Sequence, residues 1–69
     1  MAKKKVEIDI LLEEDKTWDV DVFYLQANEW VLDEDLSDAH FQTKEAALRY
    51  VEDLKKNPRI EIGKVTEKK

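Results

Sequence analysis

The first half of the chain alternates apolar and charged residues with the two-residue period of a half-buried β-strand. Residues 6–12 and 18–25 both carry this pattern, and residues 14–16 between them fit a three-residue hairpin loop. The loop length then sets the pairing of the two strands. The predicted pairs are Leu12 with Trp18, Ile10 with Val20, Ile8 with Val22, and Val6 with Tyr24.

A third strand is predicted at residues 29–33, after a three-residue loop at 26–28. This loop places Asn28 at a left-handed position, which asparagine tolerates well. The resulting register turns Trp30 and Leu32 toward the core, whereas a two-residue turn would direct them outward. We favour the longer loop because it buries both tryptophans.

Residues 33–40 show no periodicity and are predicted to be a polar loop, after which the period changes to that of a helix. Thr43 is suited to cap the helix N-terminus, and Glu45 lies in the first turn, where the helix dipole favours an anion. Pro58 ends the helix. The apolar stripe consists of Ala47, Tyr50, Val51 and Leu54, with Leu48 at its edge.

Ile60 and Ile62 begin a final strand, in which Gly63 is expected to mark a bulge that lets Val65 face inward. This strand should run parallel to the first and lie beside it. The fold prediction is a single α+β domain over residues 1–69, of ββ(β)αβ type. It comprises a three-stranded antiparallel meander, one helix and the final strand, with the helix covering one face of a single sheet. Residues 1–5 and 66–69 are expected to be frayed.

The composition limits the classes of function. A chain of 69 residues has one thin core, and the absence of cysteine removes disulfides, thiolate metal sites and cysteine nucleophiles. Three lysines at 3–5 resemble the start of a signal peptide, but the alternating strand that follows supplies no continuous apolar segment. No apolar run is long enough for a membrane span. We therefore expect a cytoplasmic protein with no membrane partner.

The net charge of −5 is unevenly distributed. Residues 6–40 contain twelve acidic side chains and one basic side chain, whereas residues 41–69 contain eight basic and five acidic ones. Direct binding of nucleic acid requires a concentrated basic surface, which this pattern does not provide. A basic protein partner is favoured instead.

The hairpin register gathers most of these acids on the sheet face opposite the helix. It places Asp9 directly across from Asp21, a like-charge pair that destabilises a sheet. The predicted partner-binding residues are Glu7, Asp9, Leu11, Glu13, Asp19, Asp21, Phe23, Leu25, Glu29 and Val31.

Three interpretations of this face remain open. The first is an ordinary solvated sheet face whose charges protect the edges. The second is a recognition face for a basic protein or for a second copy of the chain. The third is a metal site. Nucleic-acid mimicry is a special case of the second, because acids two residues apart on a strand lie roughly 6.7 Å apart.

No catalytic residue, metal site or cofactor is predicted. The acidic segment that starts at Asp33 does not match the calcium-loop pattern, since Asp38 occupies the position that needs glycine and Lys44 the position that needs glutamate. His40 is the only histidine and has no partnered nucleophile, and Ser37 lies in no activating motif. Gly63 is the only glycine, which excludes a phosphate-binding loop rich in glycine.

The motifs Trp18-x-Val20, Trp30 and Phe41-x-Thr43-Lys44-x-Ala46, followed by a helix that ends at Asn57, resemble the small bacterial YegP-like domains over residues 17–58. The second half-repeat and the glycine-rich turns of that family are absent from this chain. The resemblance implies the fold and a dimer, and it carries no site residues. In architecture, the chain is also similar to small phage-encoded inhibitors of host enzymes.

The leading hypothesis is a non-enzymatic protein-interaction module, an inhibitor or a nucleic-acid mimic, that binds a basic protein through its acidic sheet face. The alternative is a homodimeric structural domain that uses the same face or an edge strand for self-association.

Overall fold

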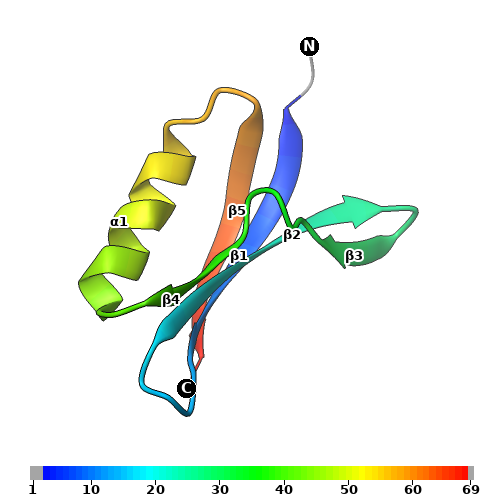
Figure 1. Ribbon diagram of the computed structural model, residues 1–69. Helices are drawn as coiled ribbons and strands as arrows, with labels where there is room; N and C mark the ends of the chain where they lie inside the picture. Colours follow the sequence, from blue (N-terminus) through cyan, green and yellow to red (C-terminus); the bar gives the residue numbers. More distant parts are fainter. Residues whose placement is uncertain (1–2, 69) are drawn as a thin grey trace.

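The computed structural model describes residues 3–68. The elements follow in the order β1 (Lys4–Leu12), β2 (Trp18–Gln26), β3 (Glu29–Leu32), β4 (Asp38–Phe41), α1 (Lys44–Lys55) and β5 (Ile60–Lys68). The strands form one mixed sheet in the order β3-β2-β1-β5, with β4 paired to β2 as well. Helix α1 packs on one face of this sheet (Figure 1). The α+β class is confirmed, and the mixed sheet has one strand, β4, more than predicted.

The β1–β2 hairpin has the predicted register. All four predicted pairs occur, from Leu12 with Trp18 to Val6 with Tyr24. The backbone amide of Glu13 donates to the Thr17 carbonyl at 2.8 Å, and Lys16 closes the loop with a φ of 71°. The side chain of Asp15 accepts hydrogen bonds from the amide and the hydroxyl of Thr17. Local turn chemistry therefore fixes this register.

Strand β5 lies beside β1 and runs parallel to it, as expected. The register shifts where Val6 pairs with Ile62 and Glu7 pairs with Lys64, so that Gly63 is the extra residue of a bulge. Pairing also extends both strands beyond the predicted limits. Residues 4–5 and 66–68 lie in strands, whereas residues 1–5 and 66–69 were expected to be frayed; residues 1, 2 and 69 lie outside the described residues.

The predicted register of the third strand is wrong. Gln26 pairs with Glu29 and Leu25 with Trp30, so the connection is a two-residue turn of Ala27 and Asn28, both in the left-handed region. Such a turn matches the right-handed twist of a hairpin. Helix α1 packs over β2, β4 and β5, so an inward-facing Trp30 would have gained little burial; its side chain faces the other way and is 48% exposed.

The prediction of a polar loop over residues 33–40 is wrong at its end, because β4 begins at Asp38. It pairs with the first half of β2, on the same edge that β3 occupies further along. A bulge between these pairs places His40 at a φ of 65°. Between the two short strands, the loop itself completes the edge: the Asp33 amide donates to the Val22 carbonyl at 2.7 Å, and the Val22 amide donates to Ser37 Oγ at 2.8 Å.

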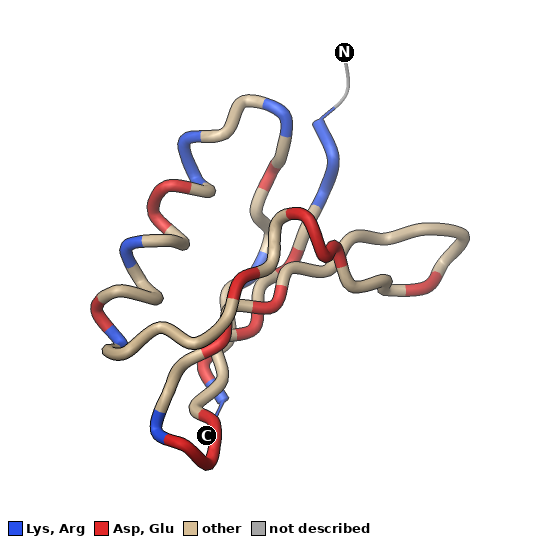
Figure 2. The backbone as a smooth tube through the Cα atoms, viewed as in Figure 1, with Lys and Arg blue, Asp and Glu red and all other residues tan. Residues whose placement is uncertain are grey.

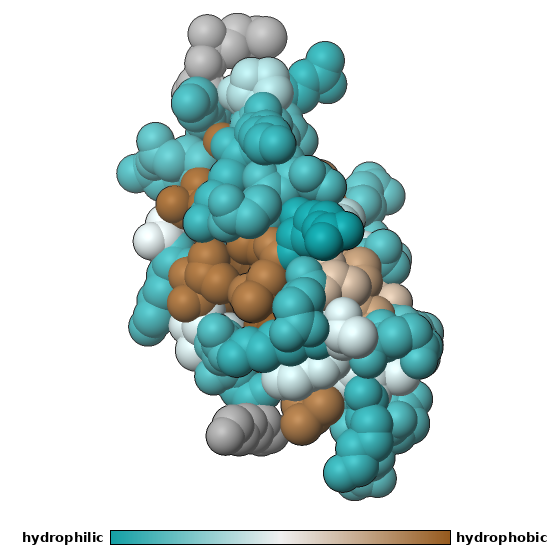
Figure 3. All heavy atoms as spheres, turned by 90° about the vertical axis from the view of Figure 1, so that its left-hand side faces the viewer, coloured by the Kyte–Doolittle hydropathy of each residue, from teal (hydrophilic) through white to brown (hydrophobic). Residues whose placement is uncertain are grey.

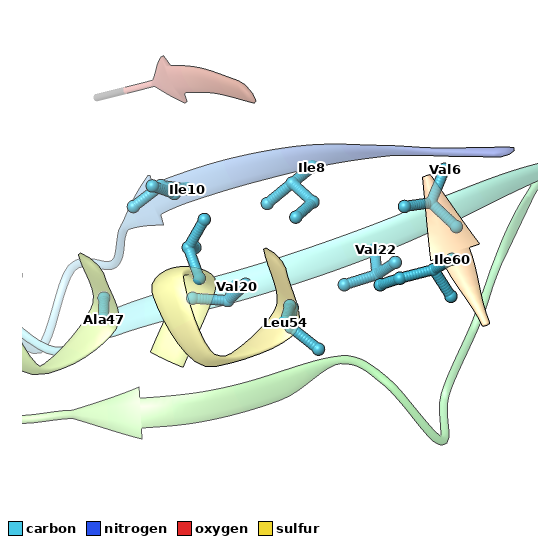
Figure 4. Packing of buried hydrophobic residues seen from close by; sticks show 9 residues of the cluster. Val6, Ile8, Ile10, Val20, Val22, Ala47, Leu54 and Ile60 are labelled. Atoms are coloured by element: carbon cyan, nitrogen blue, oxygen red, sulfur yellow. The ribbon is translucent and has the colours of Figure 1, made fainter. Parts of the chain in front are cut away.

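The core lies between the sheet and α1. Figure 4 shows side chains of β1 and β2 directed toward those of α1 and β5. Thr43 caps the helix as predicted, with its hydroxyl accepting from the Ala46 amide at 3.1 Å. The buried apolar residues are Val6, Ile8, Ile10, Val20, Val22, Ala47, Val51, Leu54 and Ile60.

Viewed from the helix side, the surface is mostly hydrophilic, with one larger hydrophobic patch near its middle and smaller hydrophobic areas around it (Figure 3). Leu48 on α1 and Val65 on β5 are among the exposed large apolar side chains, at 37% and 39%. No helix within residues 3–68 has the length and apolarity that crossing a bilayer requires.

Candidate protein interaction face

The sheet face opposite α1 is not covered by any other element of residues 3–68, and we refer to it as the outer face (Figure 1). Its members follow from the strand registers, because residues that pair share a face. They come from four strands and include acidic, apolar and basic side chains. They are Lys5, Glu7, Asp9, Leu11, Asp19, Asp21, Phe23, Leu25, Trp30, Leu32, Glu61, Lys64, Thr66 and Lys68.

The β2–β3 hairpin forms an apolar corner of the outer face. Leu25, Trp30 and Leu32 are 50%, 48% and 42% exposed, and Phe23 is half-buried beside them. A shallow depression of about 360 Å³ opens next to this corner, between the rings of Phe23 and Trp30 and the charged side chains of β1 and β5. An apolar side chain of a partner can lie in this depression with charged groups around it.

The centre of the outer face carries the like-charge pair that the sequence predicted. Asp9 pairs with Asp21 across the two strands. Partial burial raises the pKa of Asp21, and the charges of Asp19 and Asp9 raise it further. Lys68 Nζ lies 3.0 Å from Asp9 Oδ2 and balances part of the negative charge. Asp21 is thus left as the less compensated member of the pair.

A second group of acids lies at the far end of β1 and β2. The charge of Asp19 is the main cause that raises the pKa of Glu13, with smaller effects of Asp15 and Asp21. Asp19 also accepts a hydrogen bond from the His40 backbone amide at 3.2 Å. Negative charge therefore continues from the centre of the outer face to the β1–β2 loop.

The lysines of β5 are functional candidates that the sequence analysis missed. Lys64 pairs with Glu7 and Lys68 with Leu11, so both lie on the outer face beside the β1 acids. The signal was available, because the bulge at Gly63 that turns Val65 inward necessarily turns residues 64 and 66 outward. Figure 2 shows the wider division: acidic positions dominate most of β1, β2 and the loops between the strands, whereas acidic and basic positions are mixed along α1 and β5.

Eight of the ten predicted partner-binding residues lie together, seven on the outer face and Glu13 at its end. Glu29 and Val31 do not, because the shorter turn moves them to the face of Gln26 and Tyr24. The same one-residue difference brings Trp30 and Leu32 onto the outer face. Compared with the predicted set, the outer face therefore contains Trp30 and Leu32 in place of Glu29 and Val31.

On the opposite side of the sheet, Asp33 and Lys4 form a partly buried polar cluster. Lys4 Nζ lies 2.6 Å from Asp33 Oδ2 and 4.0 Å from the centre of the Tyr24 ring. The hydrogen bond from Lys4 holds the pKa of Asp33 below its usual value, and the amides of Asp35 and Leu36 contribute. Every polar group here has a partner, which indicates a structural role.

The hydroxyl of Tyr50 donates to the Leu36 carbonyl and so ties the 33–37 loop to the helix. Burial raises the pKa of Tyr50, with Asp38 and Asp33 as further causes. Within residues 3–68, no group of three or more histidine, cysteine, aspartate or glutamate side chains is arranged to hold a metal ion.

The fold and the outer face define a small two-layer α+β domain with one open sheet face. No family model, no curated protein and no solved structure matches this chain.

Proposed function

We propose that this domain is a non-enzymatic protein-interaction module that binds a basic protein segment on its outer face. The observation that supports this most directly is the position of the Phe23–Trp30 depression next to Asp9 and Asp21. An apolar patch with a charged rim is the usual appearance of a recognition surface. A partner segment with one apolar side chain and two or three cations nearby is complementary to it.

The electrostatics favour a cationic partner. Asp21 and Glu13 both have raised pKa values, in part because each lies close to other carboxylates. A lysine or arginine of a partner would relieve this repulsion, so binding would recover free energy that the isolated fold loses. An inhibitor that acts by covering a basic surface is one form of this function, in line with the resemblance to phage-encoded inhibitors.

Nucleic-acid mimicry is a less favoured form of the same function. A mimic needs an extended grid of uncompensated negative charge. Lys64 and Lys68 stand on the same face, and Lys68 already pairs with Asp9. Among the predicted acids of this face, those without an ion pair within residues 3–68 are Glu7, Glu13, Asp19 and Asp21. Lys64 pairs with Glu7 in the strand register, so the negative charge that remains suits a short basic segment better than a broad DNA-binding cleft.

The alternative, a homodimer built on the same face, meets an electrostatic obstacle. A two-fold axis that runs along the strands between β1 and β2 would lay Asp9 of one copy over Asp21 of the other. Like charges that meet in an interface cost several kcal/mol, about the whole stability of a small domain. A second copy is therefore a poorer occupant than a basic segment.

The test is an NMR titration of the ¹⁵N-labelled protein with an eight-residue peptide of alternating lysine and leucine. We expect shifts at Phe23, Trp30 and Asp21 that weaken as salt is added. The change Asp19→Asn with Asp21→Asn should reduce the affinity by roughly three- to tenfold, as for two exposed charge pairs. The matched control, Glu52→Gln with Asp53→Asn, removes two charges from the exposed side of α1.

Shifts confined to α1 or to the 33–37 loop would contradict the proposal, as would equal losses in the two double variants. Sedimentation equilibrium of the unmodified protein distinguishes the proposed function from the homodimer alternative. A monomer at high concentration removes the homodimer, and a dimer whose formation is blocked by Trp30→Ser would instead place a second copy on the outer face.

A further inference from the structure

The free edge of β5 is the longest unpaired strand edge in residues 3–68. The strand is nine residues long and pairs only with β1, so its other side presents backbone groups that no neighbouring strand satisfies. By contrast, the opposite side of the sheet is closed by two strands of four residues and the loop between them. Short edges are protected against pairing, and a long free edge is a template for it.

A groove of about 390 Å³ runs along the first part of this edge. It is lined by Lys3, Lys55 and the β5 residues 60–65, among which Lys64 is basic and Glu61 is the single acid. Val65 is 39% exposed and Ile62 is half-buried, so the groove also offers apolar contact. Its charge is opposite to that of the centre of the outer face.

We infer that the β5 edge is a docking site for an extended acidic segment of another protein, which adds to the sheet as a sixth strand. In strand addition, the backbone supplies affinity and alternate side chains supply specificity. On the α1 side of the sheet its apolar side chains would contact Ile62 and Val65, and on the outer side its acidic side chains would lie near Lys64. Lys3 and Lys55 also line the groove and add to its positive charge. This surface is separate from the centre of the outer face, and the inference does not rest on the function proposed above.

The lysines distinguish this occupant from the other candidates. A second copy that paired through its own β5 would bring three lysines and one glutamate of each groove to the seam, so the excess positive charge would be doubled rather than neutralised. The same lysines thus protect the edge from self-pairing and select an acidic strand. Single-stranded nucleic acid would use the lysines but not the unpaired backbone groups, and the groove offers no aromatic ring for base stacking.

The experiment uses the full 69-residue chain and an acetylated, amidated octapeptide of alternating glutamate and valine. We expect NMR shifts at residues 60–65 and slower hydrogen exchange of the β5 amides when the peptide is bound. Lys3→Gln with Lys55→Gln should weaken binding by roughly three- to tenfold, the effect of two exposed charge pairs. The matched control, Lys16→Gln with Arg49→Gln, removes the same charge outside the groove and should leave the affinity unchanged.

Two further probes decide between occupants. An octapeptide of alternating lysine and valine should not bind the edge, and an eight-nucleotide oligothymidylate should cause no protection of β5 amides. Absence of peptide binding, equal losses in the two double variants, or binding without protection of the β5 amides would each overturn the inference. The variant Asp19→Asn with Asp21→Asn should bind the acidic octapeptide as the unmodified chain does, so failure here is distinguishable from failure on the outer face.

Discussion

The two faces of the sheet are built from the same strands but follow different rules. On the inner face, Ile8 and Val22 are completely buried under α1, within a cluster of apolar side chains. On the outer face, at the neighbouring position of each strand, Asp9 lies opposite Asp21 without a covering layer. Cross-strand like charges weaken a sheet, whereas the inner pairs stabilise it.

The difference indicates that stability alone does not explain the outer face. A small domain has few kcal/mol to lose, and its core supplies most of them. The uncovered face carries two aspartates opposite each other, together with the exposed side chains of Trp30 and Leu25. This composition makes physical sense if another molecule covers the face. The variants below test this contrast in order of expected effect.

The largest effect is expected on the inner face. Ile8→Ala should lower the free energy of unfolding by about 2–4 kcal/mol, because it leaves a cavity at a fully buried position. In a domain this small, that loss removes most of the stability. The milder Ile8→Val, expected to cost about 1 kcal/mol, keeps the comparison measurable by urea denaturation. Leu11→Ala on the outer face should cost less than Ile8→Ala, and an equal cost would mean that both faces are packed.

The second effect concerns the ion pair that anchors the 33–37 loop. Asp33→Ala should destabilise the fold by about 1–3 kcal/mol, since Lys4 and the amides of Asp35 and Leu36 lose their acceptor. Asp33→Asn keeps an acceptor for the amides and should cost less. Thermal unfolding of the two variants checks the order, and the reverse order would contradict a capping role.

The pH dependence of this effect follows from the lowered pKa of Asp33. A carboxylate whose pKa is lower in the folded state stabilises the fold fully above its ordinary pKa and loses that contribution as pH falls through the folded value. The cost of Asp33→Asn should therefore be present at neutral pH and shrink in acid, below the ordinary value of 3.8. A cost that grows in acid would exclude the ion pair as its cause.

These variants also mark where the sequence was informative. The β1–β2 register was predictable because both partners alternate cleanly and the loop length leaves one pairing that matches apolar faces. The cap at Thr43, the helix stripe and the bulge at Gly63 were predictable for the same local reasons. Seven residues of the outer face follow directly from that hairpin.

The features of the fold and of the outer face that the sequence did not predict depend on tertiary contacts. The choice between a two- and a three-residue turn at Ala27 and Asn28 was made on burial, and the extent of α1 that decides burial is not visible in the strand itself. Strand β4 is four residues long, includes a bulge at His40 and has no period to detect. Lys64 and Lys68 join the outer face only through the parallel pairing of β5, which involves residues more than fifty positions apart.

The third effect is a gain of stability on the outer face. Asp21→Asn should raise the free energy of unfolding by a few tenths of a kcal/mol, because it removes the like-charge contact with Asp9 while leaving the Asp9–Lys68 ion pair intact. Urea denaturation in low salt measures the gain, and about 1 M sodium chloride should reduce it. A loss of stability would show that the two carboxylates share a favourable interaction.

The sign of its pH dependence is opposite to that of Asp33. The pKa of Asp21 is raised, so the folded state favours the protonated form, and stability declines as pH rises through the window between the ordinary and the raised pKa. The gain from Asp21→Asn should therefore be complete above that window and disappear in acid. A gain that persists below the ordinary value would indicate a packing effect of the amide.

A comparably small effect on stability is expected where the outer face is most apolar. Trp30→Ser should change the free energy of unfolding by no more than about 0.5 kcal/mol, because the side chain is 48% exposed and lies on the face away from α1. Trp18→Ser is the matched comparison, since Trp18 packs against the core and its loss should cost clearly more. Thermal unfolding followed by circular dichroism measures both. If Trp30→Ser costs as much as Trp18→Ser, then Trp30 supports the fold; a small cost combined with loss of lysine-leucine peptide binding would assign the ring to a partner.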